Sequence, residues 1–102
     1  MNEHIMSNEI DVTEYLRGLF ETNDVSRISE GLGNVIKAVG ATEFCRATGI
    51  SRTVIYKSLS KDGNPTLKTV LSILDYCHVR FDVKIQSGKK GIFYDLDSRK
   101  SR

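Results

Sequence analysis

The sequence has 102 residues, of which 39% are hydrophobic, enough for one compact domain with short tails. Its formal net charge of +2 is unevenly divided: residues 1–30 carry seven acidic residues and two arginines (−5), and residues 31–102 carry thirteen basic and six acidic residues (+7). It has no apolar run of membrane-spanning length, and its N-terminus, MNEHIMSNEIDV, lacks the pattern of a signal peptide, so we expect a soluble, cytoplasmic protein with no membrane association.

The first predicted helix covers about residues 12–21. Asp11 and Glu14 have the spacing of a capping box, in which side chains satisfy the exposed amides at a helix start. Apolar residues then recur at helical spacing on one face. Asp24 begins a second helix with the same kind of periodicity, and Gly40 ends it.

Two short helices follow, joined by a tight corner. The first is predicted over residues 42–48, and Ser51 caps the second. Steep helix crossings of this kind need small or apolar residues at the contact and a turn residue that accepts a positive φ. The residues that meet this description are Phe44, Cys45, Gly49, Ile50 and Ile55.

A fifth helix is predicted after Pro65, the only proline. Its apolar residues recur at helical spacing and are expected to form a buried stripe. They are Leu67, Val70, Leu71, Leu74 and Cys77. The helical part of the chain is therefore an all-α core of five helices with short connections.

The periodicity then changes from helical to alternating. The apolar residues Val79, Phe81, Val83 and Ile85 alternate with polar ones, which predicts a half-buried strand. A second alternating run over residues 92–96 follows SGKKG and suggests a hairpin. The predicted fold class is thus mostly α with a C-terminal β-strand or hairpin. Because an isolated hairpin is marginal in water, this one needs the helical core, a second subunit or another protein's sheet edge.

The tight corner has a recognisable sequence. ATEFCRATGISRTVIYKSLS, at residues 41–60, resembles the helix-turn-helix of the lambda-repressor-like superfamily, and NPTLKTVL, at residues 64–71, resembles the entry to the helix that follows it there. Thr48 departs from the pattern, because that superfamily usually has an aliphatic residue at this position. The alternative is a helical bundle with a chance tight corner.

In a helix-turn-helix the second helix enters the major groove of DNA. Arg52, near its start, could then bind O6 and N7 of a guanine with both arms of its guanidinium group. The other predicted DNA contacts are hydroxyl-bearing or cationic side chains: Thr42, Ser51, Thr53, Tyr56, Lys57 and Lys61. For the two lysines, ordinary solvated charge is the alternative. Because such domains usually pair on half-sites, a homodimer is expected, with Val79, Phe81, Val83 and Ile85 as its candidate contact.

Most of residues 10–86 resembles a particular family of such proteins. IDVTEYL at residues 10–16, TGISRTVIYKSLSKDGNPTLKTVLSIL at 48–74 and VRFDVKI at 79–85 are similar to addiction-module antidotes, the HigA-like antitoxins of type II toxin–antitoxin operons. The resemblance implies a protein that binds and neutralises a RelE/ParE-like toxin and represses its own operon. The alternatives are a stand-alone phage- or plasmid-type repressor and a helical interaction module with no DNA role.

A toxin that grips RNA presents a basic face, and the acidic first thirty residues are a natural cover for it. The candidate toxin contacts are Asp11, Glu14, Tyr15 and Glu21. Acidic residues also favour helix starts, which would explain their presence without a partner. The basic tail from Lys89 could instead bind the toxin as an added strand, or help to bind DNA.

These assignments divide the chain into four parts. They are a flexible segment at residues 1–10, the helical DNA-binding domain at 11–78, a strand or hairpin for dimerisation or toxin contact at 79–96, and a basic tail at 97–102.

No catalytic residue, cofactor or metal site is expected. The only histidines, His4 and His78, do not combine with Cys45 or Cys77 at a metal-ligand spacing. Both cysteines fall on apolar helical faces. We therefore expect them to be free, buried thiols of a protein in a reducing compartment. A nucleophilic Cys45 would need exposure and a basic partner, whereas its predicted place is a packed helix crossing.

Overall fold

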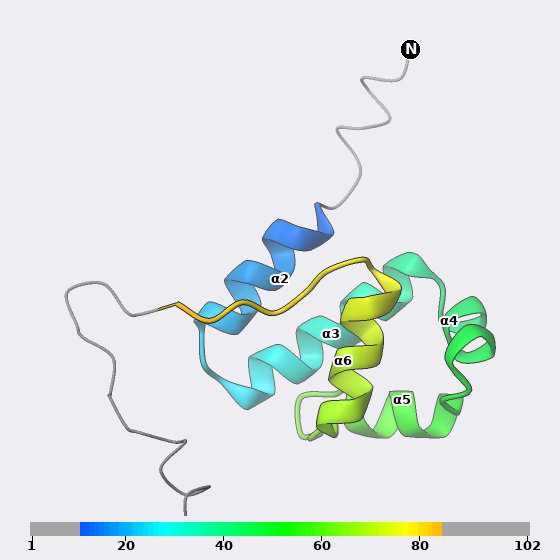
Figure 1. Ribbon diagram of the computed structural model, residues 1–102. Coiled ribbons are helices and arrows are strands. Elements are labelled where there is room, and N and C mark those ends of the chain that lie inside the picture. The colour runs from blue at the N-terminus through cyan, green and yellow to red at the C-terminus, as the bar shows by residue number, and fades with distance from the viewer. Residues whose placement is uncertain (1–10, 85–102) are drawn as a thin grey trace, which may run out of the picture.

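The computed structural model describes residues 11–84, which form five helices around one core (Figure 1). The helices are α2 (Val12–Glu21), α3 (Val25–Val39), α4 (Ala41–Thr48), α5 (Arg52–Ser58) and α6 (Leu67–Tyr76). The prediction of a mostly helical chain with five helices is confirmed. The predicted segments at residues 1–10, 85–96 and 97–102 lie outside the described residues.

Side-chain caps fix the starts of four helices. In each, a hydroxyl or carboxylate oxygen accepts a hydrogen bond from the backbone amide three residues further on, which satisfies one of the amides left free at a helix start. The capping residues are Asp11 for α2, Asp24 for α3, Ser51 for α5 and Thr66 for α6, at 3.2, 3.3, 3.1 and 3.1 Å. The polar residues between the apolar runs therefore determine where these helices begin.

Helix α3 is the centre of the bundle and contacts each of the other four helices. The buried hydrophobic residues come from all five helices and the loop after α5. They are Leu16, Leu32, Val35, Ile36, Phe44, Ile55, Leu59, Ile73 and Leu74. Phe44 is fully buried, and its ring packs edge to face on Tyr76 with the centroids 5.2 Å apart. This core joins α4 and α5 to the rest of the domain.

Two glycines in α3 mark the points of closest approach to its neighbours. A Cβ atom at Gly33 would lie 2.6 Å from the carbonyl oxygen of Leu59, and one at Gly31 would collide with the side chain of Leu19 in α2. These glycines lower the intrinsic stability of the helix. In the fold they let α2 and the end of α5 pack directly against the backbone of α3.

Two serines of α3 hold the loop that follows α5. The Ser26 hydroxyl donates to the carbonyl of Lys61 at 2.6 Å, and the buried Ser29 hydroxyl donates to the carbonyl of Gly63 at 3.3 Å. These bonds satisfy loop carbonyls by side chains from the central helix. As a result both ends of α5 are attached to the bundle.

The predicted buried stripe of α6 is wrong at two positions. Leu67 is 68% exposed and Leu71 is 44% exposed, whereas Thr69, Ile73 and Leu74 are buried. Thr69 is tolerated inside because its hydroxyl accepts a hydrogen bond from the Thr66 hydroxyl at 3.1 Å. The inward face of α6 therefore includes Thr69 and Ile73 as well as Leu74, and Leu67 and Leu71 are left exposed.

No strand is present among residues 79–84, contrary to the prediction. Helix α6 ends in a turn at His78, whose φ is 62°, and the amide of Val79 bonds back to the carbonyl of Leu74 at 2.8 Å. This hydrogen bond is typical of helices that are followed by a residue in the left-handed conformation. The chain then turns back along α2 (Figure 1).

Two of the alternating apolar residues after α6 pack against the helical core. Val79 is half-buried, and the ring of Phe81 packs edge to face on Phe20 of α2, with centroids 4.9 Å apart. Val83 is 94% exposed, and Ile85 lies outside the described residues. An extended segment that packs its side chains on a helix satisfies the alternating pattern without a neighbouring strand, which explains the incorrect assignment.

The close approach at Gly33 gives a test of the packing. Gly33→Ala is expected to destabilise the domain by about 1–3 kcal/mol, because the added methyl group meets a backbone oxygen that cannot rotate away. Gly18→Ala is the matched control: Gly18 lies in α2 with open space around it, so alanine should stabilise by about 0.5–1 kcal/mol. Urea unfolding measures both, and a neutral or stabilising Gly33→Ala would contradict the packing described.

Candidate nucleic-acid interface

Helices α4 and α5 are joined by the three residues 49–51, as predicted for the tight corner. Gly49 has φ +80°, the left-handed region that a side chain disfavours, and its amide bonds to the carbonyl of Cys45 at 2.9 Å. Of the residues predicted to pack there, Phe44 and Ile55 are buried, and Cys45 and Ile50 are half-buried against the core. The apolar side chains of the corner therefore anchor α4 and α5 to the core.

Thr48, the residue that departs from the superfamily pattern, has a role in this turn. Its hydroxyl donates to the carbonyl of Phe44 at 2.8 Å and accepts from the amide of Ile50 at 3.2 Å. An aliphatic residue would fill the same half-buried space but could not bond to the turn. The departure therefore exchanges apolar packing for hydrogen bonds that link the end of α4 to the turn.

The outer side of α5 carries four of the predicted DNA contacts. Arg52, Thr53, Tyr56 and Lys57 are all exposed, whereas Ile55 is only 2% exposed and anchors the opposite side. Ser51 is also exposed, and its hydroxyl oxygen caps α5 by accepting from the amide of Val54. The helix therefore presents one polar face with cations and hydroxyl groups and one apolar face.

Arg52 is held in place by two neighbours. Its Nη1 donates to Oγ1 of Thr42 at 2.7 Å, and its Nη2 donates to the hydroxyl of Tyr56 at 3.3 Å. Its guanidinium carbon is 5.8 Å from the centroid of the Tyr56 ring, close enough for a cation–π interaction. A guanidinium group has five N–H donors, so these two bonds leave donors for a further partner.

The remaining charges around the corner are of mixed sign. Arg46 of α4 is paired with Glu43, so its charge is largely neutralised. Lys57 and Lys61 are exposed and, among residues 11–84, form no ion pair. Asp62 follows Lys61 and offsets part of its charge. The positive charge of this surface therefore comes chiefly from Arg52 and Lys57.

The candidate toxin contacts lie on α2, on the other side of α3 from α5 in Figure 1. Asp11 caps the helix, and Glu14 pairs with Arg17 at 3.3 Å. The hydroxyl of Tyr15 accepts from Nδ2 of Asn34 at 3.1 Å, which joins α2 to α3. Glu21 is exposed at the end of the helix. Two of the four residues thus have structural roles as well.

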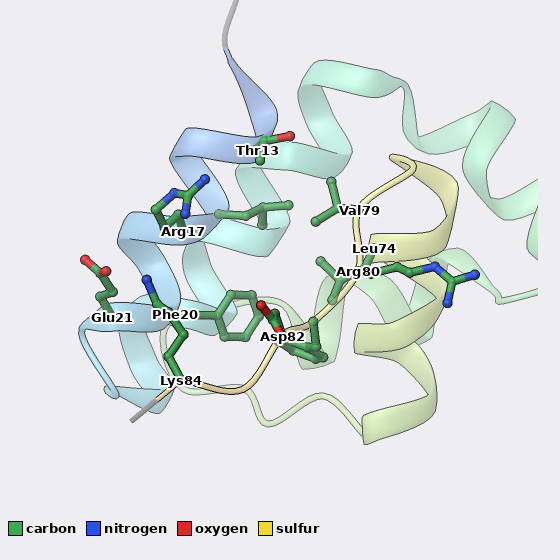
Figure 2. Close-up of a pocket in the computed structure, with 11 residues that line it drawn as sticks. Thr13, Arg17, Phe20, Glu21, Leu74, Val79, Arg80, Asp82 and Lys84 are labelled. Atoms are coloured by element: carbon green, nitrogen blue, oxygen red, sulfur yellow. The ribbon is translucent and has the colours of Figure 1, made fainter. Parts of the chain in front are cut away.

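A groove of about 370 Å³ runs between α2 and the returning segment 79–84 (Figure 2). Its apolar wall includes Leu16, Phe20, Leu74, Val79 and Phe81. Its charged residues are Arg17, Glu21, Arg80, Asp82 and Lys84. The chain therefore brings basic residues from its second part onto the acidic helix, so the division into an acidic and a basic part seen along the sequence is not kept in space.

The sequence is similar to proteins of one described family. A model of that family, described as probable addiction module antidote protein, matches residues 1–85, and the chain belongs to this family. An uncharacterized protein of Haemophilus influenzae (strain ATCC 51907 / DSM 11121 / KW20 / Rd) is 33% identical over 82 residues, which cover 80% of this chain and 84% of the relative. No solved structure matches significantly. Membership of an antidote family implies a toxin as partner.

Other kinds of site find little support in the described part of the chain. Among residues 11–84, no three His, Cys, Asp or Glu residues are grouped so that they could hold a metal ion. None of the helices α2–α6 has the length and apolar character needed to cross a membrane. Both cysteines are free and half-buried, and burial raises the pKa of the Cys77 thiol, which lowers its reactivity.

The contact between Thr42 and Arg52 could not be predicted as a pair. Each was a candidate DNA contact on its own, but their bond depends on the crossing of α4 and α5. The spacing of Arg52 and Tyr56, four residues apart on a helix, was a usable signal for the second contact. The hydrogen bonds of the Thr48 hydroxyl could not be predicted from any spacing in the sequence, except that Thr48 directly precedes the turn residue Gly49.

Ser51 allows folding and surface charge to be separated. Ser51→Ala is expected to lower the free energy of unfolding by about 1 kcal/mol, because α5 loses its cap. Ser51→Asp should retain near wild-type stability, since a carboxylate caps as well as a hydroxyl. Thermal unfolding of the two variants measures the difference. Equal stability of Ser51→Ala and wild type would show that the cap is unimportant.

Proposed function

We propose that this protein is the antitoxin of a type II toxin–antitoxin module. In this proposal it neutralises a RelE/ParE-like toxin by direct binding and represses its own operon by placing α5 in the major groove of operator DNA. Membership of the antidote family supports the toxin partner. The observation that carries the DNA role is the exposed face of α5, where Arg52 is held by Thr42 and Tyr56. The function requires no catalytic residue, cofactor or metal.

The arrangement of α5 suits a reading helix for three reasons. Its apolar side is anchored by the buried Ile55 and by Leu59 just after its end, so the polar side must face outward. Its exposed Ser51, Arg52 and Thr53 lie at the N-terminal end, the end that contacts base edges in helix-turn-helix proteins. A guanidinium group that is already ordered loses less side-chain entropy when it binds a guanine.

Binding to the operon's promoter fragment tests the reading helix. Arg52→Ala should weaken binding by about 1–3 kcal/mol and relax the preference at one base, because a two-pronged contact to guanine is lost. Lys57→Ala should weaken binding to all sequences and reduce the salt slope by about one, as expected for a phosphate contact. Titrations at several salt concentrations separate the two effects.

Two control variants make this test specific. Arg17→Ala removes an exposed cation of α2, on the other side of α3 from α5, and should leave binding unchanged. Ser51→Asp keeps the cap of α5 but places a negative charge at the interface, so it should fold normally and lose affinity. Full affinity in both Arg52→Ala and Ser51→Asp would rule out α5 as the reading helix.

The exposed acidic residues of α2 are the proposed contact for a basic toxin. Glu14 and Glu21 are exposed and distant in sequence from the corner, so they can be changed without touching α5. Glu14 adjoins Tyr15, whose hydroxyl is bonded to Asn34 of α3, and Glu21 is the last residue of the same helix, so both belong to an element that is fixed on α3. Glu21 also borders the groove that Arg80 and Lys84 line, so these two cations reduce the negative charge at this end of the helix.

Co-expression with the product of the adjacent reading frame, which the proposal expects to be a small basic protein, tests neutralisation. The wild-type chain should restore growth, and Glu14→Lys/Glu21→Lys should restore it less, because like charges then face the toxin. Asp62→Lys, an acidic residue outside α2, is the matched control and should protect fully. If the neighbour is equally toxic with and without the wild-type chain, the antitoxin role is wrong.

A further inference from the structure

The outer face of α6 is a feature of the described chain that neither the core nor the proposed sites account for. Helix α6 packs on α3 and lies in front of it in Figure 1, with Thr69, Ile73 and Leu74 buried. Leu67 is 68% exposed and Leu71 is 44% exposed at the border of this inward face. Single exposed leucines are ordinary, but these two are four residues apart and therefore lie next to each other on one helical face.

Two opposite charges flank Leu71 along the helix. Lys68 and Asp75 are exposed and seven residues apart, so they lie two turns apart on one side of the same face. Leu71 lies between them along the helix. Among residues 11–84 neither Lys68 nor Asp75 takes part in an ion pair. The face is thus an apolar stripe with a cation near its start and an anion near its end.

We propose that this face of α6 is the surface through which two copies of the chain pair, with the two α6 helices antiparallel and Leu71 near the two-fold axis. A two-fold axis at that point reverses the direction of one helix relative to the other. Lys68 of each copy then lies beside Asp75 of the other copy, within about one residue of the same level along the helix axis.

The self-complementarity of the face is the reason for choosing a second copy as the occupant. In a two-fold interface every contact occurs twice, so a patch must match its own reverse. Here the charges attract in the antiparallel arrangement, and Leu71 of one copy meets Leu71 of the other at the centre. In a parallel arrangement Lys68 would face Lys68 and Asp75 would face Asp75, which would repel. A foreign partner would have no need for this internal symmetry.

The size of the face predicts a weak pairing. A ten-residue helix is about 15 Å long, and one face of it offers less than the ~800 Å² per partner that stable complexes usually bury. We therefore expect a reversible dimer that operator DNA reinforces when two half-sites are occupied together. The pairing of the α6 helices needs no DNA, and only its reinforcement by operator DNA rests on the proposed function.

A charge exchange in the full chain tests the interface by sedimentation equilibrium. Lys68→Glu and Asp75→Lys should each weaken dimerisation by about 3- to 10-fold, because each creates two repulsive pairs. The double variant Lys68→Glu/Asp75→Lys should recover the wild-type dimerisation constant, because the pairs are restored with exchanged signs. All four residues of the face are exposed, so thermal unfolding should show that these variants fold.

Further variants distinguish this face from the other candidate interface. Leu71→Asp should abolish the dimer, whereas Val83→Asp, at the fully exposed end of the segment after α6, should leave it intact. A monomeric wild type, an unchanged dimer in Leu71→Asp, or a double charge variant no better than the single ones would overturn the proposal. A monomer that still binds operator DNA and toxin would overturn this interface alone and leave the proposed function standing.

Discussion

The packing of α5 against α3 is the constraint on which the candidate interface depends. Ile55 and Leu59 are the buried residues of this region, and Leu59 reaches the core because Gly33 lets its carbonyl approach the α3 backbone. Ser26 and Ser29 of the same helix hold the loop that follows. The orientation of α5 is therefore determined at its inner side, by contacts that involve none of the residues proposed to touch DNA.

The helices could be predicted from the sequence because local signals agreed with the fold. Asp11, Asp24 and Ser51 cap helices in the structure as their positions suggested. Apolar periodicity identified α3, whose predicted face is the one that is buried or half-buried. Where nearby residues specify the start of a helix, its apolar face and its end, the bounds of that helix can be predicted without knowledge of the tertiary packing.

Features that depend on contacts between distant residues could not be predicted in this way. Periodicity cannot show that Thr69 would be accepted in the core through the hydroxyl of Thr66, and therefore cannot show that Leu67 and Leu71 would be left outside. Likewise, the alternation of Val79 and Phe81 fits a strand and an extended segment on α2 equally well. The same limit applies to the Thr42–Arg52 bond, which requires the crossing of α4 and α5.

The separation of the candidate surfaces bears on how one small domain could serve two partners. Helices α2 and α5 lie on opposite sides of α3, so a toxin bound on the outer side of α2 would leave Arg52 and Lys57 accessible to DNA. The acidic charge of α2 also lies away from the cations of α5, which reduces its repulsion of DNA phosphates at that distance. Placing the two surfaces side by side would have forced the acidic residues against the DNA backbone. A domain built around one central helix avoids this conflict, because α3 carries each surface on a different side.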